Sequence, residues 1–345
     1  MDGDGRKRVA IACQGGGSHT AFTAGALKRL LGDDRYEIVA LSGTSGGAIC
    51  AFLAWYALMG DGESRAGERA AKLLDSFWGD NSASESFDWL LNEWTVWINR
   101  LQGSIVLPSV SPYSTPTSFW AHKQLRKTLE RHVDFGELRT PMKIPAPMLL
   151  IGAVDVLSGK FRAFNSRRDR ISSDTILAST ALPTLFRAVR TDGSVYWDGL
   201  FSQNPPVREL PRANPDEIWV IQIDPEKRDK EPKSMADILD RRNELAGNIS
   251  LYQEIDFIKK INHLVDKLVP DGTRKEKRLH VPGKEGKDDR EYRHIELRWI
   301  ELTEPLDFAS KLDRNPDFIR RLMADGEWSA EAFLRLLEPV SATNP

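Results

Sequence analysis

The sequence has little of three features, and each shortage excludes a class of protein. Only two cysteines occur, Cys13 and Cys50, each inside an apolar segment. This excludes a disulfide framework and a cysteine-based metal cluster. The 48 Lys and Arg residues against 50 Asp and Glu residues leave a net charge of −2, so no overall field recruits nucleic acid or anionic lipid. The longest apolar run, Ala48 to Met59, is shorter than the roughly 20 residues of a membrane-spanning helix.

The N-terminal stretch MDGDGRKRVAIAC also lacks the apolar core of a signal peptide. We therefore expect a cytoplasmic protein that meets a membrane only at its surface. A length of 345 residues, with 41% apolar and 28% charged residues, is typical of a folded globular chain. Neither an internal repeat nor a clear linker divides the chain, so we expect a single domain over residues 1–345.

The first 60 residues alternate between the patterns of buried strands and of helices. RVAIAC (8–13) and YEIVALSG (36–43) are short apolar runs that predict strands. Each run is followed by glycines and then by a helical pattern, over 20–31 and 46–60. This alternation predicts parallel strands joined by right-handed crossovers. Two more strands about a turn at Ser158-Gly159 are expected in 146–164, and a buried parallel strand in 217–224.

The rest of the chain predicts helices and loops. We expect a helical, Trp-rich cap or lid region over 60–140, a helix in 174–186 that breaks at Pro183, a long helix over 235–268, a mobile charged loop over 271–293, and a strand and helices over 294–345.

Gly43-Thr44-Ser45-Gly46-Gly47 fits the pattern G-x-S-x-G at a strand-to-helix junction. A sharp turn at this place lifts the serine hydroxyl above the sheet and requires small neighbours. The helix that follows directs its amides and its positive end at charge that develops near the hydroxyl. The pattern predicts a nucleophile, and helix capping by Ser45 is the alternative.

The segment QGGGSH (14–19) also lies between a strand and a helix. Consecutive glycines leave backbone N–H groups that can converge on an anion or an oxyanion. A dinucleotide loop would need glycine in place of Thr20, and a Walker A loop its Gly-Lys pair. Since neighbouring parallel strands end at one edge of a sheet, we expect loops 14–19 and 43–47 to lie side by side as a nucleophile and its oxyanion hole.

A serine nucleophile needs a base. Among the six histidines, only His19 lies in a predicted strand-end loop. Asp198, which follows a short apolar run and precedes Gly199, is the other candidate. A carboxylate beside an apolar wall can accept a hydroxyl proton directly. An Asp-Gly hairpin turn is the alternative interpretation.

Together these residues resemble the patatin-like phospholipase family, which is marked by a glycine-rich oxyanion loop, G-x-S-x-G and a later D-G-[GA]. All three occur here in the family's order, and ILASTALPTLF (176–186) is similar to the family's segment before the aspartate. The resemblance covers about residues 8–224, and the pattern over 294–334 is similar to bacterial members. Two positions depart from it: His19-Thr20 replaces a basic residue and glycine, and Leu200 replaces a small residue.

The resemblance implies a three-layer α/β/α sandwich with a mostly parallel sheet. It implies hydrolysis of acyl esters of phospholipids or related lipids through an acyl-enzyme, without metal or cofactor. Ser45 would be the nucleophile and Asp198 the general base of a dyad. The oxyanion hole would be formed by Gly15, Gly16, Gly17 and Gly46, and the motifs would be supported by Gly43, Gly47 and Gly199.

Two other functions stay open on the sequence. One is an α/β-hydrolase-type esterase in which Ser45 works with an aspartate and a histidine such as His294, although only two strands precede the serine. The other is a non-catalytic module that binds an anion or a nucleotide through the glycine loop. Head group, acyl length and oligomeric state are not predicted.

The Trp-rich segment 76–101 has two interpretations as well. A helix from residue 87 places Trp94 on one apolar face with four neighbours, Phe87, Leu90, Leu91 and Ile98. Such a helix either packs on the sandwich or forms a lid whose tryptophans rest at a lipid interface. The second interpretation predicts peripheral membrane contact through this region.

Overall fold

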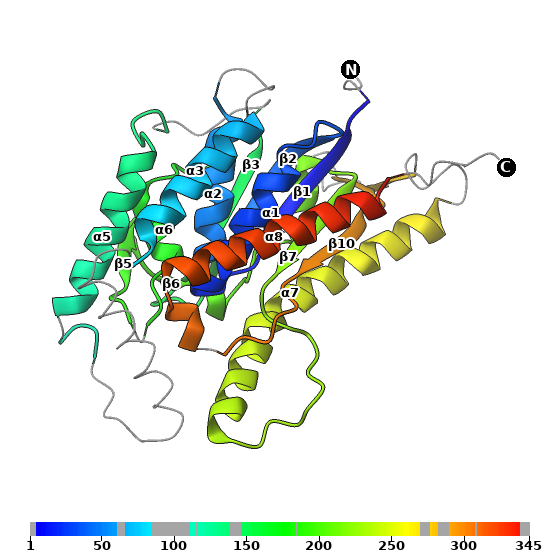
Figure 1. Cartoon of the computed structure of the whole chain (residues 1–345). Helices are drawn as coiled ribbons and strands as arrows, with labels where there is room; N and C mark the ends of the chain where they lie inside the picture. Colours follow the sequence, from blue (N-terminus) through cyan, green and yellow to red (C-terminus); the bar gives the residue numbers. More distant parts are fainter. Residues whose placement is uncertain are drawn as a thin grey trace.

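A computed structural model of the chain describes residues 5–60, 66–83, 111–114, 116–138, 146–183, 185–269, 277–281, 290–307 and 309–338. Its centre is a sheet in the order β10-β7-β1-β2-β3-β6-β5, with β4 also paired to β3. The five strands from β10 to β3 are parallel, and β4, β5 and β6 run antiparallel to their neighbours. Helices cover both faces, so the predicted three-layer α/β/α sandwich is confirmed (Figure 1).

Apart from the short β5, which was not predicted, the strands of this sheet lie at the predicted apolar runs. Their bounds are β1 Lys7–Cys13, β2 Tyr36–Gly43, β3 Met148–Asp155, β4 Phe161–Asn165, β5 Val189–Thr191, β6 Ser194–Asp198, β7 Glu217–Gln222 and β10 Glu296–Glu301.

The helices fall on the two faces of the sheet and at its β5 end. Their bounds are α1 Ala21–Leu30, α2 Gly46–Leu58, α3 Ala66–Asn81, α5 Pro116–His132, α6 Ser173–Ser179, α7 Met235–Leu268 and α8 Pro316–Leu336.

Strand β1 separates two apolar cores. Val9, Ile11 and Cys13 belong to the core with α1, α2 and α8, whereas Ala10 and Ala12 belong to the core under α7. Successive side chains of a strand point to opposite faces, which explains the alternation. Cys13 and Cys50 are both buried and free. β1 is apolar throughout because both of its faces are covered.

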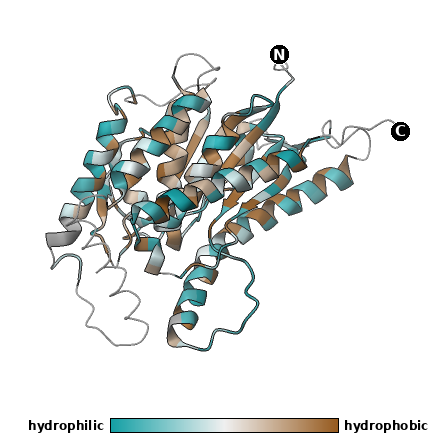
Figure 2. Cartoon of the chain, in the orientation of Figure 1, coloured by the Kyte–Doolittle hydropathy of each residue, from teal (hydrophilic) through white to brown (hydrophobic). Residues whose placement is uncertain are grey.

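The helices differ in how much of their surface is polar. α2 is apolar around almost its whole circumference, since it is buried along nearly all its length, whereas α7 and α8 each carry a polar face (Figure 2). The outer helices thus bury one stripe and expose the other. No helix in the described ranges combines the length and the apolar character needed to cross a membrane.

One predicted loop is in part wrong. Within 271–293, residues Arg278–Val281 form β8 and Arg290–Arg293 form β9, and the two strands pair antiparallel. The charged composition predicts a solvated loop. Charges of opposite sign also pair across strands, however, and here Arg278 Nε lies 3.2 Å from Glu291 Oε1. Residues 271–276 and 282–289 lie outside the described residues.

The Trp-rich segment is described only at its beginning. Phe77 and Trp78 lie on α3 and are buried in the core, as the packing interpretation predicts. Residues 84–101 lie outside the described residues, so a lid formed by them stays a prediction.

The side chain of Asn315 caps the N-terminus of α8. The Asn315 side chain accepts hydrogen bonds from the backbone N–H groups of Asp317 (2.9 Å) and Phe318 (3.3 Å). Asn315→Ala is expected to lower the free energy of unfolding by about 1 kcal/mol, because helix N–H groups lose their acceptor. Asn315→Asp keeps the acceptor and should unfold in urea close to wild type; equal losses in both variants would contradict the capping role.

Candidate active site

Three strands bring the predicted site residues to one edge of the sheet. Gly43, the last residue of β2, pairs with Cys13 of β1 and with Ile151 of β3. Two residues further along β3, Ala153 pairs with Asp198, the last residue of β6. The loops after β1 and β2 and the end of β6 therefore meet, as predicted for parallel β1 and β2.

The glycine loop and the serine turn are in direct contact. A Cβ atom added to Gly15 would lie 2.6 Å from the Thr44 carbonyl oxygen and 3.0 Å from Ser45 Cβ, so only glycine allows this approach. A Cβ atom on Gly46 would lie 2.7 Å from the Gly17 carbonyl oxygen. The supporting glycines also make close backbone contacts, Gly43 with Gly47 and Gly199 with Gly152.

Ser45 has the strained backbone expected of a serine on a sharp turn. Its φ is 56° and its ψ −130°, in a region that side-chain-bearing residues rarely adopt. Ser45 N–H donates to Ser179 Oγ (3.0 Å), and Ser179 Oγ donates to the Gly152 carbonyl (2.6 Å). Thr44 Oγ1 donates to the Gln203 carbonyl (2.6 Å). These bonds fix the turn from two sides.

The Asp198 carboxylate is buried beside Ser45. Its residue is 2% exposed, and Asp198 Oδ1 accepts the Leu200 N–H at 2.9 Å. The Ser45 hydroxyl interacts with this carboxylate and acts to lower its pKa. Burial raises the pKa of Asp198 to about 7 and outweighs both this effect and that of the hydrogen bond from Leu200. The two residues predicted as a dyad are thus brought together.

Only part of the glycine loop is open to an anion. Gly15 N–H already donates to Asn204 Oδ1 at 2.7 Å. Across the described part of the chain, the N–H groups of Gly16 and Gly17 have no acceptor. Gly17 has φ of +57°, which favours glycine. In this loop the N–H groups of Gly16 and Gly17 therefore stay available as donors, whereas the N–H group of Gly15 fixes the loop.

Two buried polar residues of the site were missed in the sequence. Ser179 supports the Ser45 amide, and Asn204 supports the Gly15 amide; both residues are fully buried. Asn204 also donates to the Gly247 carbonyl (3.3 Å) and to Ser250 Oγ (3.1 Å) of α7. Single polar residues inside apolar stretches near the motifs were the available signal, because a buried polar group requires a specific partner.

The two histidines considered as partners of Ser45 make hydrogen bonds elsewhere. His294 lies just before β10 and contacts Asp266 at 3.1 Å, at the sheet edge opposite Ser45 because β10 is parallel to the strands that lead to the site. His19 is 3% exposed and lies 2.8 Å from Ser310 Oγ. Within the described ranges, no group of three or more His, Cys, Asp or Glu side chains is placed to hold a metal ion.

A model of the family described as patatin-like phospholipase matches residues 11–211, more than half of the chain. The chain belongs to this family. Lipid acyl hydrolysis is the general activity of patatin-like phospholipases, and they act on lipid esters. The matched residues include both Ser45 and Asp198.

Several chains of solved structures are similar to this chain. VipD from Legionella pneumophila has a TM-score of 0.42 and 13% sequence identity, over 96% of this chain and 67% of that chain. No curated protein matches the sequence.

The raised pKa of Asp198 predicts a stability that depends on pH. The unfolded carboxyl has its ordinary pKa of 3.8, and the folded one a pKa of about 7. Between these values the folded state holds a proton that the unfolded state has lost, so stability falls as pH rises. Asp198→Asn cannot ionise. Its melting temperature should match wild type near pH 4, exceed it increasingly as pH rises towards about 7, and keep a constant excess above that, which corresponds to on the order of a few kcal/mol in stability.

Asp155→Asn is the control of opposite sign. Asp155 ends β3, and hydrogen bonds, first of all from Ser194, lower the pKa of its carboxyl. That carboxylate stabilises the fold above its unfolded pKa, so this variant should lose stability towards neutral pH. A difference between Asp198→Asn and wild type that stays constant with pH would contradict the raised pKa.

Proposed function

We propose that this patatin-like phospholipase hydrolyses acyl esters of phospholipids or related lipids with Ser45 as nucleophile and Asp198 as general base. The observation that carries the proposal is the Ser45 hydroxyl beside a buried carboxylate whose pKa is about 7. A base is most effective when its pKa lies near the working pH. An exposed aspartate, mostly ionised but weakly basic, would not serve as well.

In the acylation step, Ser45 Oγ attacks the ester carbonyl carbon, and its proton passes to Asp198. The carbonyl oxygen becomes an oxyanion that accepts hydrogen bonds from the amides of Gly16, Gly17 and Gly46. The tetrahedral intermediate then expels the alcohol part of the lipid, which takes the proton from Asp198. The acyl group stays on Ser45 as an ester.

In the deacylation step, a water molecule replaces the alcohol. Asp198 takes one proton from the water as its oxygen attacks the acyl carbon, and the same oxyanion donors act again. When the intermediate collapses, Ser45 Oγ leaves and recovers the proton from Asp198. The products are a carboxylic acid and the starting enzyme, so one carboxyl group transfers every proton in both halves.

The start of α2 supports charge separation in both steps. Ser45 is the N-cap residue of this helix, so the positive end of the helix dipole faces the oxyanion. Strained backbone at Ser45 and short contacts with the glycine loop keep these dipoles in place before substrate binds. Such preorganised donors are typically worth about 10²- to 10³-fold each in kcat.

Ser45→Ala and Asp198→Asn test the dyad. Wild type should react covalently with a fluorophosphonate probe and hydrolyse a series of p-nitrophenyl esters. Ser45→Ala should lose labelling, and both variants should lose about 10³-fold or more in kcat, because each removes one half of the proton transfer.

His294→Ala is the matched control for the triad alternative and should keep wild-type turnover. A loss of about 10³-fold in this variant would replace the dyad by a triad. If wild type neither labels nor turns over but is stabilised by a nucleotide in a thermal shift, the anion-binding alternative holds instead.

The pH dependence of turnover gives an independent test of Asp198. Only its carboxylate form accepts the Ser45 proton, so kcat/KM should rise with pH and level off above an apparent pKa of about 7. Initial rates on a soluble ester in buffers from about pH 5 to about pH 9 measure this profile. A flat profile across that range would rule out a base with a raised pKa.

A further inference from the structure

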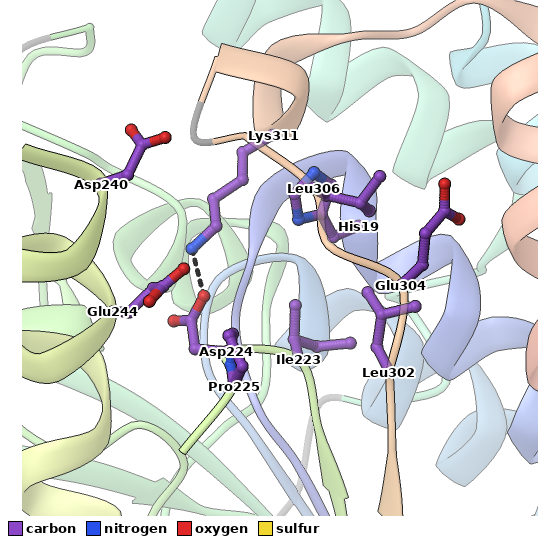
Figure 3. Close-up of a pocket in the computed structure, with 10 residues that line it drawn as sticks. All are labelled: His19, Ile223, Asp224, Pro225, Asp240, Glu244, Leu302, Glu304, Leu306 and Lys311. Atoms are coloured by element: carbon purple, nitrogen blue, oxygen red, sulfur yellow. Dashed lines mark hydrogen bonds and ion pairs between the residues drawn. The ribbon is translucent and has the colours of Figure 1, made fainter. Parts of the chain in front are cut away.

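A short C-terminal segment lies against the glycine loop. The 3₁₀ turn η6, Ala309–Leu312, packs beside η1, Gly17–Thr20. A Cβ atom on Gly17 would collide with the Lys311 carbonyl oxygen, so the two backbones are in contact. Figure 3 shows a pocket beside this contact, with His19 and Lys311 among the residues that line it. Segment 309–312 lies outside residues 11–211, which the family model matches.

His19 joins the two segments through a hydrogen bond whose direction can be assigned. Burial lowers the pKa of His19 well below its usual value, so the imidazole is neutral. Ser310 Oγ donates its one proton to the Asp307 carbonyl (2.7 Å). His19 Nε2 must therefore carry the proton that it shares with Ser310 Oγ at 2.8 Å. The C-terminal segment thus accepts a hydrogen bond from His19, two residues after the last glycine of the loop.

An ion pair between Lys311 and Asp224 holds segment 309–312 in place (Figure 3). Asp224 is 2% exposed, and its second oxygen, Oδ2, has no hydrogen-bond partner in the part of the chain that the structure describes. A buried carboxylate is costly unless a cation offsets it. The position of Lys311 is therefore strongly determined by Asp224.

Asp224 is in turn connected to the first residue of the glycine loop. The backbone N–H groups of Ile223 and Asp224 donate to Gln14 Oε1, at 2.7 and 2.8 Å. Gln14 Nε2 donates to Asn248 Oδ1 at 2.7 Å. These contacts connect Gln14 through Asp224 and Lys311 back to Gly17. Both ends of the glycine loop are therefore held by the same set of residues.

We propose that Lys311 is a positioning residue for the oxyanion hole. Its ion pair with Asp224 holds segment 309–312 against Gly17 and so fixes the direction of the Gly16 and Gly17 N–H groups. The inference rests on the proposed function, because it assigns these amides to the oxyanion. Lys311 itself touches no reacting atom, so it should act on the transition state and not on binding of the ground-state ester.

Lys311→Met removes the cation and keeps most of the side-chain volume. We expect kcat on a soluble p-nitrophenyl ester to fall about 10-fold to 100-fold, with KM within about twofold of wild type. A trifluoromethyl ketone analogue provides the second readout: Ser45 Oγ adds to its carbonyl carbon, the proton passes to Asp198, and the oxygen occupies the oxyanion hole. Its inhibition constant should rise by the same factor as kcat/KM falls.

Two control variants separate positioning from general stability. Lys311→Arg keeps the charge and should restore most of kcat. Lys7→Met breaks another ion pair to a buried carboxylate, because Lys7 Nζ lies 2.7 Å from Oε1 of Glu217, the first residue of β7, which also pairs with Arg298. Lys7→Met should lower the melting temperature but keep kcat per fluorophosphonate-reactive site.

The outcomes separate this inference from the proposed function. An active wild type whose kcat is unchanged in Lys311→Met, or falls equally in Lys7→Met, overturns the positioning role alone; an inactive wild type overturns both. If Lys311→Met does not fold, the double variant Lys311→Met/Asp224→Asn leaves no unpaired carboxylate and should show the same loss of kcat. Wild-type kcat in the double variant would overturn the proposal as well.

Discussion

The placement of the Ser45 hydroxyl beside the buried Asp198 carboxylate is the constraint on which the proposed site depends. It is effective only where water does not compete for the carboxylate, because water would hold its pKa near the ordinary value. The sheet provides that environment: β6 runs antiparallel along the end of β3 and delivers Asp198 beside the turn after β2. The same geometry that excludes water also makes the aspartate basic enough to act.

This arrangement costs stability in two places. Ser45 holds a backbone conformation that non-glycine residues avoid, and Asp198 carries a charge in an apolar environment. Neighbouring polar groups offset part of each cost, Ser179 at the Ser45 amide and the Leu200 N–H at the carboxylate. Leu200 thus departs from the small residue that is usual in the family without disturbing the aspartate, since it is the backbone that donates.

The fold could be predicted from the sequence wherever residues close together in the chain determine the structure. The apolar runs that became β1 and β2, and the glycines after them, predict their own structure and their common edge. The meeting of Ser45 with Asp198 was not derivable from spacing, because it depends on strand pairing through β3; the family resemblance provided it. Ser179, Asn204 and Lys311 acquire their roles only through distant partners. Charge composition alone misassigned β8 and β9, where cross-strand pairing decides the structure.

The glycine loop shows why a motif alone does not make an oxyanion hole. Three glycines leave the N–H groups accessible, yet the same freedom lets the loop adopt many conformations. Here each part of the loop is restrained by a different segment: Gln14 by Asn248 of α7, Gly15 by Asn204, and Gly17 by η6. Two of these restraints come from residues beyond 211. In the proposed mechanism, catalytic preorganisation is therefore a property of the complete sandwich: the matched motif region would supply the reacting groups without fixing all of their directions.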